Sequence, residues 1–225
     1  MTEIKSALNL PSSSVHNMLQ TMVSTELLSM SGGYEYVLGP RAIGTAFSIL
    51  GSLDIKQIAR KQLLELAQKV GDSVYLALRA GDKIFYADRM PGTQRISLDI
   101  RLGEPLFLHC TATGKLFAAF DPALQKKTLS SNLKKLTPFT LVDKKALERE
   151  FDEIRNLGYS KSNQEAVEGV IGYAIPVHQK TDQVIAAIHI SVIEKRGDRS
   201  HEIKLIEEAL ECARQIEKNL GNFSF

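Results

Sequence analysis

The sequence has little of several features that would assign a protein to a class at once. Only two cysteines occur, Cys110 and Cys212, and their wide separation indicates neither a disulfide framework nor a zinc ribbon, so we expect both to be reduced and buried. The longest apolar stretch, near Val184–Val192, is too short to cross a bilayer, and we find no signal peptide. The sequence therefore predicts a cytoplasmic protein without a membrane partner.

The first fifty residues lack a basic patch. They carry two cations, Lys5 and Arg41, against three acids, Glu3, Glu26 and Glu35. Because most nonspecific affinity for DNA comes from lysine and arginine that release counterions, a DNA reader built from this segment would depend on backbone amides, helix N-termini, hydroxyls and dimeric avidity. We therefore expect a single copy to bind DNA weakly.

What the chain does have is enough material for two domains. Its 225 residues, 44% of them hydrophobic, predict a small N-terminal domain followed by one of ordinary size. The formal net charge of +2 leaves no region that demands an acidic partner.

The N-terminal pattern predicts two short helices joined by a tight turn. Thr2 can cap the first helix, Asn9 stands where a helix end tolerates a left-handed backbone, and Pro11 blocks continuation. Three serines then offer N-caps for a second helix. The predicted apolar stripe of that helix is Val15, Met18, Leu19 and Met22.

The opposite face of the second helix carries hydroxyl, imidazole and amide groups, which donate and accept hydrogen bonds as reading of base edges requires. These candidate DNA-binding residues are Ser12, Ser13, Ser14, His16, Asn17 and Gln20. Leu27–Met30 and Tyr34–Leu38 flank Ser31–Gly33 as a hairpin would, which completes a winged helix-turn-helix over residues 1–39. The pattern alone leaves ordinary packing of these elements as the alternative.

Residues 40–53 predict a connector helix that begins at Pro40 and ends at Gly51–Ser52. Asp54 can then cap a longer helix that Gly71 ends. The face of this second helix is predicted from Ile55, Ile58, Ala59, Leu66 and Val70. The second domain is therefore placed at residues 54–225.

Strand and helix patterns in the second domain predict an α+β fold with a mainly antiparallel sheet. Strands are expected at residues 74–78, 83–88, 95–100, 170–177 and 184–192, and helices at 111–120 and 143–157. A final amphipathic helix is predicted to bury Ile203, Ile206, Leu210, Ala213, Ile216 and Leu220. The lysine pairs between residues 126 and 145 are interpreted as solvated helix and loop surface.

Four motifs extend over essentially the whole chain. Two are Leu10–Met22 and Tyr36–Gly39 in the N-terminal part, and a third is Gly103–Lys115, which carries a glycine, proline, leucine, histidine and Gly-Lys pattern. The fourth consists of Gly158–Ser160, Glu165, Gly169–Val170 and Ala174–Val177. Together they resemble the IclR-type transcriptional regulators, in which the first motif is similar to the recognition helix and the second to the strand that leaves the wing. The resemblance implies a winged helix-turn-helix followed by a GAF-like effector-binding domain, assembled as homodimers or homotetramers on operator DNA.

The sequence departs from that family at two places. Members usually have another helix before the one that begins at Thr2, so the first helix is apparently missing here, through a wrongly chosen start codon or a natural truncation. At Asn17 relatives commonly carry arginine, and the asparagine removes a phosphate or base contact.

The segment Thr111–Lys115 predicts a helix N-terminus, which presents unpaired amides and partial positive charge to an anion. A capped helix that packs tightly at Gly114 is the structural alternative, and the absence of an upstream glycine at P-loop spacing disfavours nucleotide hydrolysis. By resemblance, the effector pocket would be lined by Leu98, Ala112, Thr113, Ser162, Val170, Gly172, His189 and Ser191. Because Ser162 is neutral where relatives can place an acid, we expect a small organic acid rather than an amine.

Metal binding and catalysis find little support. His109, Cys110 and His189 are possible zinc ligands, but their separation favours buried, satisfied histidines, so neither metal nor cofactor is predicted. Acid and base pairs could be drawn from Asp88, Glu104, His109, Glu165 and His178, yet no spacing fixes them together, and we expect no enzyme.

The leading hypothesis is a ligand-responsive transcription factor, in which effector binding changes the arrangement of an oligomer and thereby its affinity for operator DNA. Apolar residues of the connector, Ile43 to Leu50, are expected to pair between subunits. The alternative is a small-molecule sensor or oligomerisation protein that has lost DNA binding through its truncated head.

Overall fold

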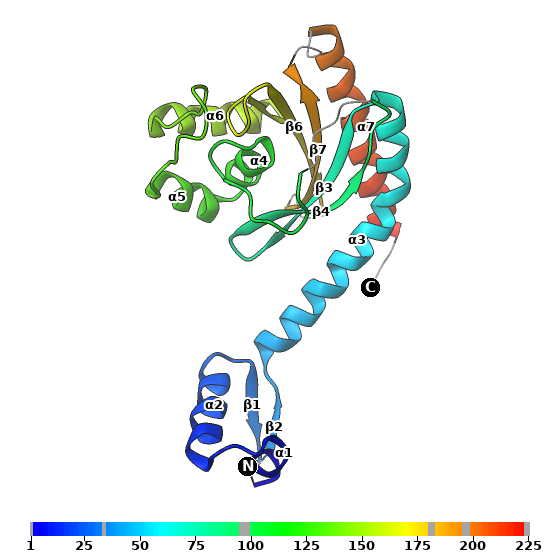
Figure 1. The fold of residues 1–225 in the computed structure, drawn as a ribbon. Coiled ribbons are helices and arrows are strands. Elements are labelled where there is room, and N and C mark those ends of the chain that lie inside the picture. Colours follow the sequence, from blue (N-terminus) through cyan, green and yellow to red (C-terminus); the bar gives the residue numbers. More distant parts are fainter. Residues whose placement is uncertain (1, 33–34, 95–99, 180–182, 195–198, 223–225) are drawn as a thin grey trace. The chain divides into compact units, whose positions relative to one another are not determined.

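The computed structural model describes residues 2–32, 35–94, 100–179, 183–194 and 199–222. Its backbone contacts divide the chain into two compact units, Met1–Asp54 and Ile55–Phe225. Each unit has its own secondary structure (Figure 1).

The N-terminal unit contains two helices and a hairpin, as predicted. Helix α1 spans Thr2–Leu8, helix α2 spans Ser12–Ser24, and the antiparallel strands β1 and β2 span Leu28–Ser31 and Glu35–Leu38. Asn9 adopts a left-handed backbone with φ of 50°, which confirms its expected role after α1. The apolar stripe of α2 is also confirmed, with Val15 and Leu19 buried and the two methionines half-buried.

Two details of the N-terminal unit differ from the predictions. The serines do not cap α2, because Pro11 occupies the N-cap position without a side-chain hydrogen bond and the serines form the first turn. The backbone of Pro11 still accepts a hydrogen bond from Val15 N at 3.1 Å, so the turn is closed by the main chain.

The expected break between a connector and a second helix is wrong. Helix α3 runs without interruption over Pro40–Val70 and passes through Gly51–Ser52. Glycine costs a helix about 1 kcal/mol relative to alanine and serine less, whereas only proline blocks the helical hydrogen bond, so these two residues weaken α3 without ending it.

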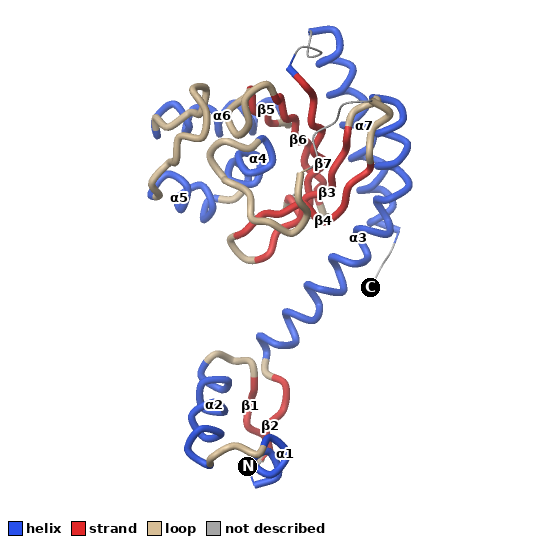
Figure 2. The backbone as a smooth tube through the Cα atoms, viewed as in Figure 1, coloured by secondary structure: helices blue, strands red, loops and turns tan. Residues whose placement is uncertain are grey.

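A five-stranded antiparallel sheet forms the centre of the second unit (Figure 2). Its order is β4-β3-β7-β6-β5, with every neighbouring pair antiparallel. The strands span Ser73–Ala80 (β3), Lys83–Met90 (β4), Ser160–Asn163 (β5), Val170–His178 (β6) and Val184–Ile193 (β7). The α+β fold and the mainly antiparallel sheet are as predicted.

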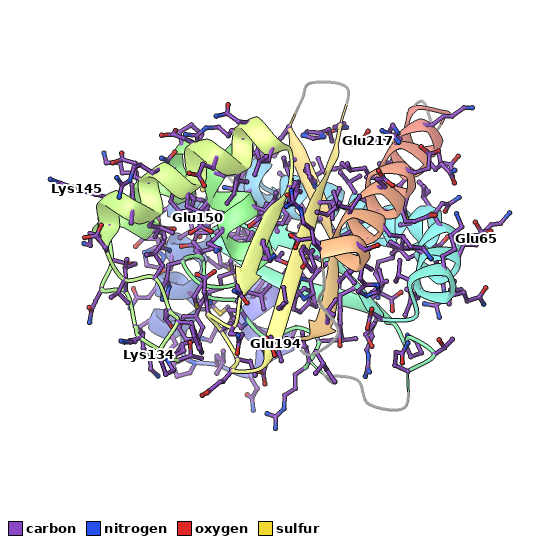
Figure 3. The ribbon with its side chains drawn as sticks, turned by 90° about the horizontal axis from the view of Figure 1, so that it is seen from above. Glu65, Lys134, Lys145, Glu150, Glu194 and Glu217 are labelled. Carbon is purple, nitrogen blue, oxygen red and sulfur yellow. The ribbon has the colours of Figure 1, made fainter. Side chains whose placement is uncertain are left out.

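Helices cover both faces of this sheet (Figure 1). One face packs against α4, α5 and α6, which span Ala112–Phe120, Pro122–Ser130 and Lys144–Leu157. The other packs against residues 55–70 of α3 and against α7, Arg199–Asn222. The sheet therefore separates two apolar cores, whose side chains fill the space between the layers (Figure 3).

Several predictions about the second unit need correction. Helix α5 and strand β5 were not expected, because the first is rich in lysine and the second consists of four polar residues. The buried face predicted for α7 is wrong at the start of the helix. Ile203, which was expected to be buried, is half exposed, whereas Leu205, Ala209 and Cys212 are buried. The strand expected at residues 95–100 falls, except for Ile100, outside the described residues.

Both cysteines are free and buried, as predicted. Among the described residues, no helix is long and apolar enough to span a membrane.

Candidate functional site

The outward face of α2 presents all six candidate DNA-binding residues to solvent. Ser12, Ser13, Ser14, His16, Asn17 and Gln20 are exposed, whereas Val15 and Leu19 hold the opposite face in the interior. Thr21 Oγ1 donates to the backbone oxygen of Asn17 at 2.8 Å, which leaves the Asn17 amide outside that contact. The helix therefore offers donors and acceptors in a row, without a cation among them.

A cavity of about 110 Å³ lies in the second unit, where strands β4, β5, β6 and β7 meet the N-terminus of α4. Six of the eight predicted effector residues line it: Ala112, Ser162, Val170, Gly172, His189 and Ser191. The rest of its wall comes from Thr111, which begins the segment singled out from the sequence, and from Tyr86, Ile100, Leu106, Ala166 and Val167, which the sequence pattern did not single out. We call this cavity the sheet pocket.

The other two predicted residues are placed differently. Thr113 is buried behind the sheet pocket, where its Oγ1 lies 3.2 Å from the Tyr86 hydroxyl. Leu98 lies outside the described residues. Thr113 therefore supports the pocket through Tyr86 instead of lining it.

His189 is the main polar side chain of the sheet pocket. Its ring stacks in a tilted arrangement 5.0 Å from that of Tyr86, and Gly172 makes room for it, since a Cβ there would lie 2.8 Å from His189 Cε1. Burial lowers the pKa of His189 to about 3, so the imidazole is neutral at physiological pH.

His189 is buried, as expected, and the backbone of Tyr173 forms a hydrogen bond with its ring, but the ring is not fully satisfied. Its Nδ1 is buried and has no hydrogen-bond partner. His109, by contrast, is satisfied as predicted, because its Nε2 lies 2.9 Å from the carbonyl oxygen of Lys134.

A second polar atom of the sheet pocket is also unpaired. Ser191 Oγ is buried without a partner, while Ser162 Oγ donates to the backbone oxygen of Cys110 at 2.7 Å. Buried polar atoms are paired in the great majority of cases, and an unpaired one costs about 1–3 kcal/mol. The two unpaired atoms, His189 Nδ1 and Ser191 Oγ, are therefore suited to the polar group of a ligand.

The N-terminus of α4 is both capped and tightly packed. Thr111 Oγ1 accepts a hydrogen bond from Gly114 N at 3.0 Å, and a Cβ on Gly114 would lie 2.2 Å from Phe107 O. The structural alternative raised for this segment therefore holds at Gly114. Thr111 and Ala112 nevertheless line the sheet pocket, so the first turn of α4 also faces the cavity.

Lys115, the last residue of the Gly-Lys pattern, is fully buried in an ion-pair network. Its Nζ lies 2.5 Å from Glu150 Oε1 and 2.6 Å from Glu165 Oε1. Burial raises the pKa of Glu165, and repulsion from Glu150 adds to this against the attraction of Lys115. The sequence did not reveal this network, because its three members are 35 and 50 residues apart.

Three of the acid and base residues weighed for catalysis pair with other side chains. Asp88 pairs with Arg60 at 2.8 Å, Glu104 with Arg101 at 3.3 Å, and His178 with Glu217 at 3.1 Å. Within the described residues, no three histidine, cysteine, aspartate or glutamate side chains form a cluster suited to a metal ion. Burial also raises the pKa of the Cys110 thiol to about 12, so this cysteine remains protonated.

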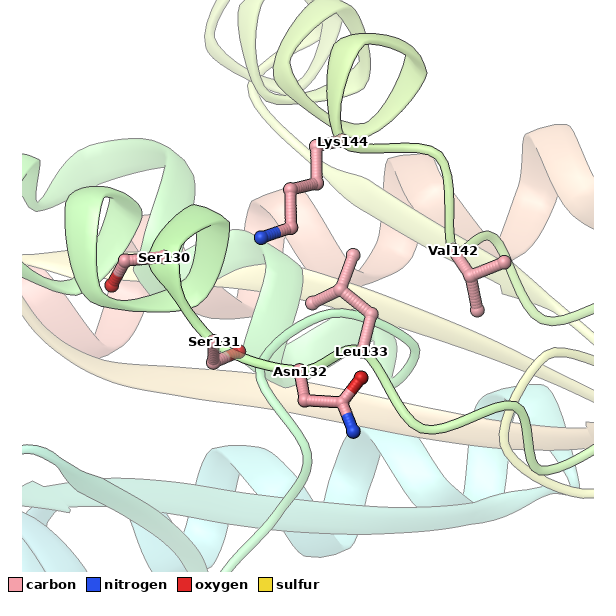
Figure 4. A pocket seen from close by; sticks show the side chains of 6 residues that line it. All are labelled: Ser130, Ser131, Asn132, Leu133, Val142 and Lys144. Atoms are coloured by element: carbon pink, nitrogen blue, oxygen red, sulfur yellow. The ribbon is translucent and has the colours of Figure 1, made fainter.

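A second hollow lies where α5 ends and α6 begins (Figure 4). Its volume is about 530 Å³, and the lining residues are Ser130, Ser131, Asn132, Leu133, Val142 and Lys144. The hydroxyls of Ser130 and Ser131 donate to carbonyl oxygens of α5 at 3.0 and 2.8 Å. This surface hollow thus presents no buried, unpaired polar group of the kind found in the sheet pocket.

Comparison with known proteins assigns the family. The model of the bacterial transcriptional regulator IclR C-terminal domain matches residues 47–218, which is most of the chain. The chain belongs to the IclR family of bacterial transcriptional regulators. It is also 31% identical over 195 residues to the "Probable transcriptional regulator SauR" of Cupriavidus necator, a match that covers 85% of this chain and 77% of that protein.

Solved structures agree with the IclR assignment. The crystal structure of Thermotoga maritima IclR aligns with a TM-score of 0.71 at 27% identity and covers 98% of this chain and 90% of that one. An IclR homologue from Microbacterium hydrocarbonoxydans, crystallised in complex with 4-hydroxybenzoate, aligns with the same TM-score at 23% identity, again covering 98% and 90%. At that identity the second likeness shows the fold alone.

Proposed function

We propose that this IclR-family regulator is controlled by a small organic acid that binds in the sheet pocket. The observation that carries the proposal is the pair of buried, unpaired polar atoms, His189 Nδ1 and Ser191 Oγ, on the wall of one cavity. Both side chains are less than one-tenth exposed, so solvent does not readily replace the missing partner. A ligand group that bonds to both would remove the cost of leaving them unpaired.

The chemistry of the sheet pocket favours a carboxylate. The pocket wall carries no charged side chain among its described residues, and His189 is neutral. The Gly114 amide of α4 is already capped by Thr111, but the first turn of the helix still supplies a partial positive charge that favours an anion. An ammonium ligand would meet the same partial charge as repulsion and would find no carboxylate on this wall.

The rest of the ligand would lie against apolar surface. Leu106, Val170 and the Tyr86 ring provide that surface, and a cavity of about 110 Å³ limits the ligand to a small molecule. The homologue crystallised with 4-hydroxybenzoate supports this class, because that molecule combines a carboxylate with a compact apolar ring.

DNA binding is proposed for the exposed face of α2. Its hydroxyl, imidazole and amide groups suit hydrogen bonding to base edges and phosphates. Since the face lacks cations, useful affinity would require two or more copies, and we propose a homodimer or homotetramer in the cytoplasm. The effector would act by binding two oligomer arrangements with different affinity, a coupling typically worth about 1–3 kcal/mol.

Fluorescence anisotropy with DNA from upstream of the gene tests this function. Specific binding that weakens with salt and loses affinity in Gln20→Ala would support it. Ser24→Ala at the end of the same helix is the matched control, since it alters an exposed hydroxyl away from the six candidates. Binding that is absent at low salt, or equal for any sequence, would favour the alternative of a sensor that has lost DNA recognition.

Isothermal titration with small acids and amines tests the ligand class. Acids are expected to bind and amines to fail. Preferential binding of amines would overturn the carboxylate proposal while leaving the DNA experiment unaffected.

A further inference from the structure

The segment Gln164–Gly169 forms one wall of the sheet pocket through Ala166 and Val167. Both of its ends turn through left-handed backbone, with φ of 60° at Gln164 and 77° at Gly169. Gly169 N donates to the side chain of Gln164 at 3.0 Å and closes the segment into a loop. We call this segment the pocket loop.

Apolar burial does not hold the pocket loop in place. Val167 is 46% exposed, Ala166 is only partly buried, and Glu165 is the one buried residue of the loop. Polar contacts must therefore hold the loop in place, and Glu165 makes such contacts.

Glu165 is held from two directions. Its backbone oxygen accepts a hydrogen bond from Thr140 Oγ1 at 2.6 Å, and its carboxylate Oε1 accepts one from Lys115 Nζ at the same distance. Thr137 Oγ1 adds a bond to the backbone oxygen of Gln164 at 2.7 Å. The threonine contacts fix the start of the loop, and the lysine contact fixes it to α4.

Lys115 lies one helical turn after Ala112, which lines another wall of the sheet pocket together with Thr111. Helix α4 therefore contributes Thr111 and Ala112 to one wall of the sheet pocket. The same helix holds the pocket loop, which forms another wall, through the ion pair of Lys115 with Glu165. Glu150, which projects from α6 (Figure 3), is the second partner of the same ammonium. Because a buried ammonium is stable only with partners that offset its desolvation, Lys115 has little freedom to leave Glu165.

We propose that Lys115 and Glu165 are positioning residues for the sheet pocket. Their buried ion pair sets the separation between the wall at Thr111–Ala112 and the wall at Ala166–Val167, and so decides which ligands fit. This inference rests on the proposed effector pocket and names the residues that fix its width. Neither residue lines the pocket itself.

Hydrogen exchange of the ligand-free protein tests the positioning role. The reporters are Gly169 N and Gln164 N, which bonds to the Val170 oxygen at 2.9 Å. In Lys115→Met and Glu165→Gln we expect both amides to exchange about tenfold faster or more, with the amides of β3 unchanged, because only the loop loses its ion pair with α4 while the threonine contacts remain. Glu150→Gln is the matched control, since it neutralises the other partner of Lys115 and leaves the loop contact in place.

Lys115→Met also leaves two carboxylates without their cation and can lower overall stability. Glu165→Gln keeps the shape and an acceptor oxygen, so it retains the fold and keeps the test decisive. The proposal is overturned if the loop amides of both variants exchange at wild-type rates. It is equally overturned if Glu150→Gln accelerates the loop as much, or if β3 accelerates together with the loop.

Ligand binding provides a second readout that separates this inference from the proposed function. The chain has no tryptophan, so Val167→Trp places a single fluorescent side chain on the pocket loop, and its emission can report ligand binding. Titration with 4-hydroxybenzoate is expected to give weaker binding when Glu165→Gln is added, and unchanged binding when Glu150→Gln is added. Equal affinities of the Glu165→Gln and Glu150→Gln proteins for the acid would overturn the positioning role. If the Val167→Trp protein binds neither this acid nor any other acid of the panel, that result counts against the proposed ligand class. The exchange data alone then decide the positioning role.

Discussion

The two units of the chain differ sharply in how much apolar surface they bury. In the described part of the N-terminal unit only Val15 and Leu19 are buried apolar side chains, while Leu8, Met30 and Leu38 are about half exposed or more. The second unit, Ile55–Phe225, has two apolar cores on opposite faces of one sheet. Because small domains bury a smaller fraction of their surface, we expect the N-terminal unit to be the less stable of the two.

This difference suits a regulator. A unit with a large apolar core can contain a pocket in which two polar atoms are unpaired, because the core offsets the loss of stability that these atoms cause. A marginal unit responds to small changes in its surroundings, since local opening requires less free energy there. The contrast predicts that core substitutions in the two units have different consequences.

The largest effect is expected from Phe151→Ala in the core between α6 and the sheet. Phe151 is fully buried, and truncation of such a side chain costs about 3–5 kcal/mol. Leu19→Ala should cost about 2–5 kcal/mol, but within the N-terminal unit alone. Urea unfolding followed by circular dichroism should shift the main transition in the first variant and only an early, smaller transition in the second.

A single transition that shifts equally in both variants would break the comparison. It would mean that the two units unfold as one body and that the smaller core is not the weaker one. Leu64→Ala provides a surface control, since that side chain is 40% exposed on α3.

Acid is expected to destabilise the second unit through His189. Its pKa is about 3 in the folded protein and about 6.5 in the unfolded chain, so the folded state binds fewer protons between these values. The stability is complete above pH 6.5 and falls as the pH decreases, by about 2 kcal/mol at pH 5. Urea unfolding at pH 7 and pH 5 should show this loss in the wild type and a smaller loss in His189→Gln.

Gly172→Ala is expected to disturb the sheet pocket more than the fold. Its new Cβ would lie 2.8 Å from His189 Cε1, so the imidazole must move, and overpacking of this kind costs about 1–3 kcal/mol. Ligand titration should show a marked loss of affinity. An unchanged affinity would mean that His189 does not contact the ligand.

The smallest change in stability is expected from Ser191→Ala. Because Ser191 Oγ has no partner, its removal should leave unfolding within about 0.5 kcal/mol of the wild type or stabilise the protein slightly. Acid binding should weaken about tenfold, as expected for the loss of one hydrogen bond. Ser160→Ala is a control, because Ser160 Oγ is also buried and unpaired but does not line the pocket.

Sequence patterns predicted the elements whose signals are local. Gly158, with φ of 74°, ends α6 where a glycine was expected to end it, and Asp143 caps the same helix. Helix α5 was not predicted, although Asp121 caps it and Pro122 follows, which is a typical helix start. Its lysines were interpreted as solvated surface, so this start was overlooked. Strand β5 has no apolar pattern, because pairing with β6 specifies it.

The candidate site was predictable only in part. Six of its residues were expected from family motifs, but nothing in their spacing indicated that His189 and Ser191 would be left without partners. The network of Lys115 with Glu150 and Glu165 depends on contacts between segments far apart in the chain. Local patterns cannot encode such contacts, because tertiary packing creates them.

Coupling between the sheet pocket and DNA is tested most directly by anisotropy of upstream operator DNA with and without an acid that titration has shown to bind. The acid is expected to change the DNA affinity of the wild type by roughly 5- to 150-fold. A much smaller change is expected in Ser191→Ala at the same acid concentration. Identical DNA-binding curves with the sheet pocket empty and saturated would show that ligand binding does not control DNA binding.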